Sequence, residues 1–193
     1  MCIRDRDIVA SGSQKGYMIP PGLSFIAMSQ KAWEAAEKSN LPKFYLNLKS
    51  YRKSLSSNSN PYTPAVNLVF ALDEALKMMR DEGLDNIFLR HNKHKLAMSN
   101  AVKALNLKLF ADEKYLSPSI TAIKTEGMDA EEFRKTIKSN FDILLAGGQD
   151  HLKGKIFRVG HLGYVNDRDI ITVVSAISNT CLLYTSPSPR DLS

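Results

Sequence analysis

A short turn near the start of the chain holds the side chain best suited to covalent chemistry. The segment SGSQKG at residues 11–16 directly follows the apolar run IVA at residues 8–10, which predicts a buried strand that ends in a tight glycine turn. A lysine at the tip of such a turn is held by the backbone, which suits an amine that must form a Schiff base with a fixed carbonyl. The turn also carries donors that could reach a phosphate, on Ser11, Ser13 and Gln14. The alternative is that Lys15 is a solvated loop residue.

A basic run at residues 90–95, with the sequence RHNKHK, is a second candidate for chemistry. On a helix it predicts a solvated face, and the alternative is a patch that binds phosphate or nucleic acid. No aromatic residues are interleaved with the charges, so the run lacks platforms on which bases could stack. His91 and His94 are spaced as metal ligands on a helix could be, but no nearby carboxylate or cysteine completes the set, so we expect no metal site.

Bulk composition indicates an ordinary globular protein. The 193 residues are 44% hydrophobic and 24% charged, with a formal net charge of +6 that permits an anionic partner without requiring one. There is no apolar run of about 18 residues that could cross a membrane, and the start lacks the pattern of a signal peptide. We therefore expect a cytoplasmic protein with neither a membrane nor a nucleic acid as partner.

The two ends do not fit the rest of the sequence. Residues 1–6 show no periodicity, and residues 181–193 (CLLYTSPSPRDLS) are rich in serine and proline and continue no core pattern. Both are predicted to be non-native, disordered tails. The two cysteines, Cys2 and Cys181, lie in these tails, so residues 7–180 offer neither a disulfide nor a catalytic thiol.

Periodicity and turn residues predict the elements between the tails. The first half is expected to contain strands over 7–10 and 23–28, a helix over 30–38 capped by Ser29, an extended segment over 44–48, an exposed loop over 50–63 and an amphipathic helix over 64–81. After Gly83 we expect helices over 84–105, 129–137 and 167–178 and strands over 107–110, 119–125, 143–145 and 156–159. This order favours an α+β region with a largely antiparallel sheet, and Asn106 suits the C-terminal cap of its first helix.

Three ordered motifs resemble the class V, pyridoxal-phosphate-dependent aminotransferases, in particular the alanine–glyoxylate and serine–pyruvate branch. They are SGSQKG at 11–16 with PPG at 20–22, YTP at 62–64 with the helix that follows, and KIFRVGHLG at 155–163. The resemblance implies an α/β fold in which residues 7–82 end the large cofactor-binding domain of a fold-type I aminotransferase. Residues 83–180 would form its small C-terminal α+β domain.

The resemblance also implies roles for single residues. Lys15 would be the catalytic lysine that holds pyridoxal 5'-phosphate, and Gln14 would contact the cofactor phosphate. Thr63 would reach the phosphate of the neighbouring subunit's cofactor in a homodimer with shared active sites, supported by either Tyr62 or Asn60. Arg158 would bind the substrate's α-carboxylate. Without the family, Thr63 could simply cap the following helix and Arg158 could be a surface arginine on an edge strand. His161 could serve packing or support the site.

The implied reaction is transamination between a small amino acid, such as alanine or serine, and a 2-oxo acid such as glyoxylate or pyruvate. Lys15 would move the proton between the substrate's α-carbon and the cofactor. The family's phosphate loop, ring-stacking aromatic residue and pyridine-pairing aspartate precede the lysine, so we expect this C-terminal fragment to be inactive alone. Two alternatives are a lyase or desulfurase of the same fold and a non-enzymatic basic binding domain.

Overall fold

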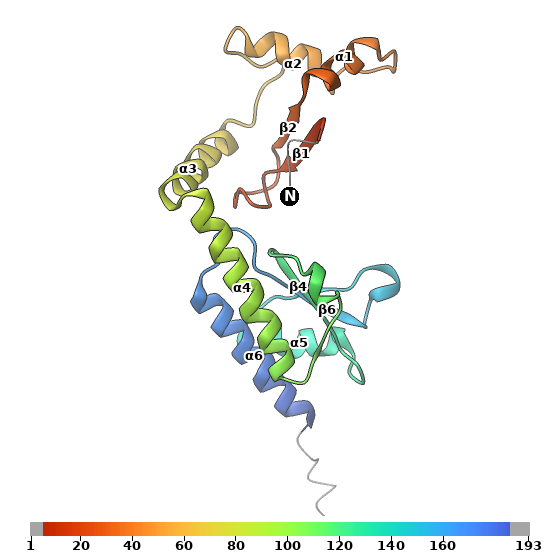
Figure 1. Ribbon diagram of the computed structural model, residues 1–193, viewed down its shortest axis with the longest axis vertical. Coiled ribbons are helices and arrows are strands. Elements are labelled where there is room, and N and C mark those ends of the chain that lie inside the picture. Colours follow the sequence, from red (N-terminus) through yellow and green to blue (C-terminus); the bar gives the residue numbers. More distant parts are fainter. Residues whose placement is uncertain (1–5, 186–193) are drawn as a thin grey trace, which may run out of the picture. The chain divides into compact units, whose positions relative to one another are not determined.

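The computed structural model describes residues 6–185 and divides into two units, Met1–Asp81 and Glu82–Ser193. Each unit has its own helices and strands (Figure 1). Within the part of the chain that is described, no helix is both long and apolar enough to cross a membrane.

Unit 1 begins with the two predicted strands, but the first of them is exposed and not buried as expected, because it has a strand partner on one side only and no core covers its faces. β1 (Ile8–Gly12) pairs antiparallel with β2 (Ser24–Met28), with Ile8 opposite Met28 and Gly12 opposite Ser24. The helix predicted after β2 is α1 (Gln30–Lys38), and the Ser29 side chain caps it by accepting a hydrogen bond from the Ala32 N–H at 3.1 Å. The strands therefore form a hairpin whose loop carries Lys15.

The prediction for residues 44–55 is wrong. In place of an extended segment and a loop, the structure has a turn followed by the helix α2 (Leu48–Leu55). The Asn47 side chain caps this helix by accepting from the Lys49 N–H at 3.2 Å. Polar residues fill most of α2 and none of its side chains is buried, so apolar periodicity gave too weak a signal.

Two long helices follow and meet at a glycine. α3 (Val66–Glu82) and α4 (Leu84–Ala104) are separated by Gly83, which has a φ of 82° that L side chains rarely adopt. Asn106 ends α4 with a left-handed φ of 56°, and the N–H of Leu107 bonds back to the Val102 carbonyl at 3.0 Å. The predicted glycine break and asparagine cap are both confirmed.

Unit 2 contains a four-stranded antiparallel sheet. Its strands are β3 (Lys108–Leu109), β4 (Ile120–Lys124), β5 (Ala146–Gly147) and β6 (Ile156–Gly160), in the order β3-β4-β6-β5. Short 3-10 helices, η2 (Glu113–Tyr115) and η3 (Asp150–Leu152), lie in the connections. The strand predicted at 143–145 is displaced to β5. The reason is that Leu145 is buried in the core without joining the ladder, which starts one residue later.

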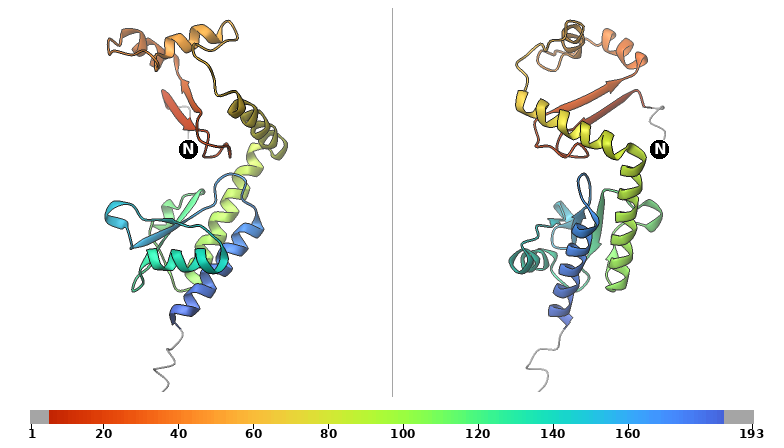
Figure 2. Two further views of the ribbon diagram at one scale, coloured as in Figure 1. Left: turned by 180° about the vertical axis from the view of Figure 1, so that it is seen from behind. Right: turned by 90° about the vertical axis from the view of Figure 1, so that its left-hand side faces the viewer.

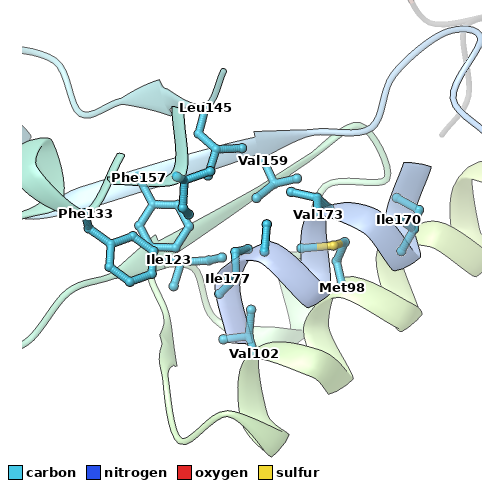
Figure 3. Packing of buried hydrophobic residues seen from close by; sticks show 12 residues of the cluster. Met98, Val102, Ile123, Phe133, Leu145, Phe157, Val159, Ile170, Val173 and Ile177 are labelled. Carbon is cyan, nitrogen blue, oxygen red and sulfur yellow. The ribbon is translucent and has the colours of Figure 1, made fainter. Parts of the chain in front are cut away.

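One face of this sheet packs on three helices, α4, α5 (Ala130–Phe141) and α6 (Asp167–Thr185). Ile123 of β4 and Phe157 of β6 are register partners on this face, and Figure 3 shows them among buried side chains of the helices. Phe133 of α5 stacks on Phe157 with ring centroids 5.1 Å apart. Both views in Figure 2 show α4 and α6 side by side, and the two helices are in contact.

The helix α6 continues to Thr185, which corrects the prediction of a disordered tail from residue 181. Cys181 follows the fully buried Ile177 by one helical turn and packs against the same core. The Tyr184 ring lies 5.9 Å from the Phe133 ring. The serine- and proline-rich composition that suggested a tail belongs to residues 186–193, which lie outside the described residues, as do residues 1–5.

Candidate functional site

The turn that carries Lys15 is held in shape by Ser13, which is completely buried. The Ser13 hydroxyl donates to the Pro20 carbonyl at 2.8 Å and accepts from the Leu23 N–H at 3.2 Å. Its backbone N–H bonds to the Leu23 carbonyl at 3.0 Å, and its carbonyl accepts from the Ile19 N–H at 3.3 Å. Every polar group of Ser13 therefore ties the two arms of the hairpin loop together.

This arrangement corrects one expectation for the turn. The Ser13 hydroxyl was expected to be available to a phosphate, but its donor and acceptor capacity is used within the loop. Gln14 and Lys15 follow it and are both exposed. Lys15 is fixed through its backbone, since its N–H bonds to the Gly12 carbonyl at 3.4 Å and its carbonyl accepts from the Met18 N–H at 3.0 Å. The loop is therefore pinned beneath the lysine while the amine stays free to react.

The residues after Lys15 bring the loop against α3. Gly22 has a φ of 143°, and a Cβ built on it would lie 2.5 Å from Leu68 Cδ1. Leu68 lies in the first turn of α3, close in sequence to Thr63. A side chain larger than hydrogen at Gly22 would strain the backbone and would force the end of the Leu68 side chain to move. The structure thus joins the lysine loop to the start of the helix that follows Thr63.

Thr63 and Tyr62 have different surroundings. The Tyr62 hydroxyl donates to the Phe44 carbonyl at 3.2 Å, and its ring lies 4.7 Å from the Tyr45 ring. Thr63 is exposed, and its hydroxyl has no hydrogen-bond partner within residues 6–185. It does not cap α3, because the Ala65 carbonyl accepts from the N–H groups of Leu68 and Val69 at the helix start. The helix-cap alternative is therefore wrong.

An open hollow of about 800 Å³ lies beside these residues. It is lined by consecutive residues of the segment before α3, which are Asn58, Ser59, Asn60, Pro61, Tyr62, Thr63 and Pro64. Asn60 and Thr63 are exposed there, whereas Tyr62 is half-buried against the aromatic rings. Of Tyr62 and Thr63, it is therefore Thr63 whose hydroxyl is more available to an anion in this hollow.

Arg158 lies on β6, which is an inner strand between β4 and β5. The edge-strand alternative is therefore wrong. Its register partners are Ala122 and Ala146, and its neighbours Phe157 and Val159 point into the core, so Arg158 is on the opposite face of the sheet. Its Nε donates to the Gly147 carbonyl at 2.8 Å. Small residues on the adjacent strands leave room for the guanidinium along this face.

His161 has a structural role. It is completely buried, its Nδ1 lies 3.1 Å from the Pro118 carbonyl and its Nε2 lies 2.9 Å from the Thr121 hydroxyl. Because a carbonyl can only accept, Nδ1 carries the proton and Nε2 accepts from Thr121. Burial, together with the charges of His94 and His91, lowers the pKa of His161. The histidine therefore joins β4 to the segment after β6 as a neutral side chain.

The basic run at 90–95 is not the solvated face that its composition suggests. Arg90 donates to the carbonyls of Gly163 and Val165 at 2.9 and 2.8 Å and pairs with Glu82, whose pKa it lowers. His91 and His94 are buried. Half of the run therefore packs inside unit 2, which leaves little free charge for a nucleic-acid patch. Within the described residues, no three or more histidine, cysteine, aspartate or glutamate side chains gather so that they could hold a metal ion.

The predicted site residues fall into two groups. Gln14, Lys15, Tyr62 and Thr63 belong to unit 1, and Arg158 belongs to unit 2. Sequence reasoning missed Gly147, whose carbonyl binds Arg158, and Arg134, whose Nε donates to the Leu145 carbonyl at 2.8 Å beside it. The doublet Gly147-Gly148 is the only local signal in the sequence for these contacts, and by itself it predicts no more than a turn.

The sequence is similar to known proteins over most of its length. The sequence profile described as "Aminotransferase class-V" matches residues 4–165. The soluble hydrogenase 42 kDa subunit of Anabaena cylindrica is 57% identical over 171 residues, which are 89% of this chain and 45% of the relative. The L-aspartate–glyoxylate aminotransferase of Paracoccus denitrificans is 38% identical over 163 residues, covering 83% of this chain and 41% of that protein.

Among solved structures, the alanine–glyoxylate aminotransferase of a Nostoc species superposes with a TM-score of 0.84 at 28% identity. The match covers 90% of this chain and 48% of that one. The mixed α/β fold thus matches an aminotransferase structure. The chain spans about half the length of the relatives that it matches.

Proposed function

Since this chain belongs to the class-V aminotransferase family, whose enzymes depend on pyridoxal 5'-phosphate, we propose that the complete protein is a transaminase of small amino acids. The amino donor would be alanine, serine or a similar amino acid, and the acceptor a 2-oxo acid such as glyoxylate or pyruvate. The single observation that carries the proposal is the Lys15 turn, where a fully buried Ser13 fixes the loop beneath an exposed lysine. The names of the aspartate–glyoxylate and alanine–glyoxylate relatives support glyoxylate as acceptor.

The residues of unit 1 fit the cofactor chemically. Lys15 offers an exposed primary amine to an aldehyde, and the exposed Gln14 amide and Thr63 hydroxyl offer hydrogen bonds to a phosphate. When bound, pyridoxal phosphate supplies a ring that withdraws electrons from the substrate's α-carbon. Lys15 would take the proton from that carbon at its Nζ and return it later, as both general base and general acid.

Arg158 would bind the α-carboxylate that every amino-acid and oxo-acid substrate carries. A guanidinium can pair with both carboxylate oxygens at once, which a lysine cannot copy. We also propose the fold-type I arrangement, in which residues 7–82 end the large domain and residues 83–180 form the small one. Arg158 lies on an inner strand of a packed sheet, and such a strand would hold the clamp rigidly.

The proposed homodimer shares its active sites, with Thr63 contacting the cofactor phosphate of the partner. Unit 1 exposes large apolar side chains, such as Phe44, Leu46 and Phe70. Their exposure supports the proposal that another subunit or the rest of the protein covers this surface. Mixing two inactive variants, Lys15→Ala and Thr63→Ala, should restore activity if sites are shared, because half of the sites in mixed dimers carry neither change.

The cytoplasmic location stays a prediction that cell fractionation would test.

The rival functions have less support. A desulfurase needs a reactive thiol, but residues 7–180 contain none, and burial against the core raises the pKa of Cys181. The basic binding domain loses its main argument because Arg90, His91 and His94 pack within unit 2. The hydrogenase name of one relative calls for a direct assay of hydrogen-dependent dye reduction by the complete protein.

The decisive experiment uses the complete protein, with upstream sequence of the kind that the relatives carry. Borohydride reduction followed by peptide mapping should place the cofactor on Lys15, and Lys15→Ala should abolish both the visible absorption band of the bound cofactor and transamination. Lys38→Ala, at an exposed lysine of α1, serves as the matched control. A label on another lysine, or hydrogen-dependent dye reduction without transamination, would show that the proposal is wrong.

A further inference from the structure

The clamp proposed for Arg158 depends on how its guanidinium is oriented. An arginine side chain rotates about several bonds, so an unsupported one would have to be ordered each time a carboxylate binds. In the structure, Nε donates to the Gly147 carbonyl at 2.8 Å, and within residues 6–185 the two Nη nitrogens have no hydrogen-bond partner. A carboxylate can therefore pair only with the outer edge of the guanidinium, through both Nη groups at once.

The Gly147 carbonyl belongs to a strand that is weak in itself. β5 has only two residues, Ala146 and Gly147, and it pairs on one side only, with β6. Helix α5 holds the residue before it, because Arg134 Nε donates to the Leu145 carbonyl at 2.8 Å. The Nη1 of Arg134 in turn pairs with Glu131 at 2.8 Å. This ion pair is mostly buried, with side-chain exposures of 22% for Arg134 and 31% for Glu131.

Gly147 makes room for that ion pair. A Cβ built on Gly147 would lie 2.6 Å from Arg134 Nη1 and 2.7 Å from Glu131 Oε1. Its φ is not in the left-handed region, so a side chain here would meet no backbone strain, but the ends of Arg134 and Glu131 would have to shift to make room for it. The adjacent Gly148 has a separate reason to be glycine, because its Cβ would lie 2.0 Å from the Leu152 carbonyl oxygen.

From these contacts we infer that Gly147, Arg134 and Glu131 are positioning residues for the carboxylate clamp. The inference rests on the proposed function, since it assigns Arg158 to the substrate's carboxylate. The ion pair of α5 occupies the space that a side chain at Gly147 would fill. Arg134 of this pair also holds the Leu145 carbonyl. The Gly147 carbonyl then fixes Arg158 Nε, and only the two Nη groups face a ligand. None of the three positioning residues touches the substrate.

The test compares variants of the complete enzyme that leave Arg158 in place. Gly147→Ala adds a methyl group against the ion pair, and Arg134→Gln removes the pair without adding volume. Both should raise KM for amino-acid and oxo-acid substrates about tenfold with kcat little changed, which is the signature of binding lost equally from the ground state and the transition state. A decarboxylated amine should be used as well as before. Lys135→Gln removes the same charge from an exposed position of α5 and should change nothing.

A second readout follows Arg158 itself, without substrate. In enzyme labelled with ¹⁵N-arginine, the Arg158 Nε–H resonance, assigned by its loss in Arg158→Lys, should exchange slowly with solvent. Its exchange rate should rise several-fold in Gly147→Ala and in Arg134→Gln, and it should not change in Lys135→Gln. If Gly147→Ala does not fold, Arg134→Gln gives the answer alone.

The outcomes separate this inference from the proposed function. Wild-type KM values and wild-type Nε–H exchange in both variants would overturn the inference, and so would equal losses on amino acids and on the amine. If Arg158→Ala leaves amino-acid turnover intact, the assignment of the clamp is wrong, whatever the exchange rates show. Faster Nε–H exchange with selective loss for carboxylate substrates supports the positioning role.

Discussion

The two units bury their apolar side chains to very different extents. In unit 2, residues from α4, α5, α6 and the sheet form one continuous core, and Phe133 and Phe157 at its centre are completely buried. In the described part of unit 1, the buried apolar residues are Ile19, Ala32 and Ala75. Large side chains such as Phe70, which is 70% exposed, face outward. Unit 2 can therefore hold its shape by its own packing, whereas unit 1 has little core of its own and leaves large apolar side chains exposed.

This difference bears on the two halves of the proposed site. Arg158 is placed by a packed sheet and by the α5 ion pair, so many contacts would have to change before it moved. Lys15 lies in a unit with little core, and its position rests on the hydrogen bonds of one buried hydroxyl. Substitutions in unit 2 should therefore act mainly on global stability or substrate binding, and substitutions in unit 1 on the local order of the loop.

The largest effect is expected from the core of unit 2. Phe133→Ala removes a fully buried ring that stacks on Phe157, which should lower the free energy of unfolding by about 3–5 kcal/mol. Phe70→Ala makes the same change at an exposed position of unit 1 and should cost the isolated chain less than about 0.5 kcal/mol. Denaturant unfolding of the isolated chain measures both. Similar losses for the two variants would contradict the contrast between the units.

The next effect concerns the clamp. In the complete enzyme, Arg158→Ala should lower kcat/KM for amino acids by about 30- to 1000-fold, since a forked, charge-assisted contact is lost. Arg158→Lys should restore only part of the activity, because an ammonium group cannot form the fork. The absorption spectrum of the bound cofactor should hardly change.

Two comparisons sharpen the result for Arg158. Arg168→Ala changes an exposed arginine of α6 and should leave kcat/KM as it is. A decarboxylated amine should be almost indifferent to Arg158→Ala. Equal losses for amines and amino acids would mean that Arg158 is a structural residue and that the carboxylate binds elsewhere.

Sequence patterns predicted the elements of this fold best where apolar periodicity or a special backbone conformation leaves a strong signal. The strands β1 and β2, the break at Gly83 and the cap at Asn106 were found in this way, whereas the pairing of β1 with β2 was not predicted. The helix α2 was missed because it buries no side chain, and the extension of α6 because its last turn borders a polar segment.

Contacts between distant residues left no such local signal. The exposed Lys15 and Gln14 could be placed in a turn from the spacing of glycines and serines. The burial of Ser13 could not be predicted, since it depends on Pro20 and Leu23 across the loop. In the same way, the orientation of Arg158 depends on Gly147 and on helix α5. The spacing of residues in the sequence does not indicate that either lies near Arg158.

A smaller effect is expected from Ser13→Ala. The change removes the hydroxyl that bonds to the Pro20 carbonyl and the Leu23 N–H, which are only partly buried, and should cost about 0.5–1.5 kcal/mol locally. Amide exchange at Ile19 and Leu23 should accelerate, and the complete enzyme should bind its cofactor more weakly. Ser11→Ala, at an exposed serine of β1, is the control. Unchanged exchange in Ser13→Ala would show that the loop is held by other contacts.

The smallest effect is a dependence on pH that belongs to unit 2 alone. All four histidines of the sequence, at positions 91, 94, 151 and 161, lie in this unit. Burial, then the nearby His94 and His91, hold the pKa of His161 below the ordinary value of 6.5, while the Pro118 carbonyl opposes this. The unfolded chain therefore binds a proton at His161 at a higher pH than the folded chain does. The stability that neutral His161 contributes is complete above pH 6.5 and declines as the pH falls from there toward the folded pKa.

His161→Gln should remove this part of the acid sensitivity, because an amide can still donate to the Pro118 carbonyl and accept from the Thr121 hydroxyl without taking up a proton. His151→Gln is the matched control, since it makes the same change at an exposed position of unit 2. Urea unfolding between pH 7.5 and about pH 5 would give the free energy of unfolding of the three proteins. The slope against pH should be smaller for His161→Gln than for the wild type and unchanged for His151→Gln. An unchanged slope in His161→Gln would mean that groups other than His161 cause the acid sensitivity of unit 2.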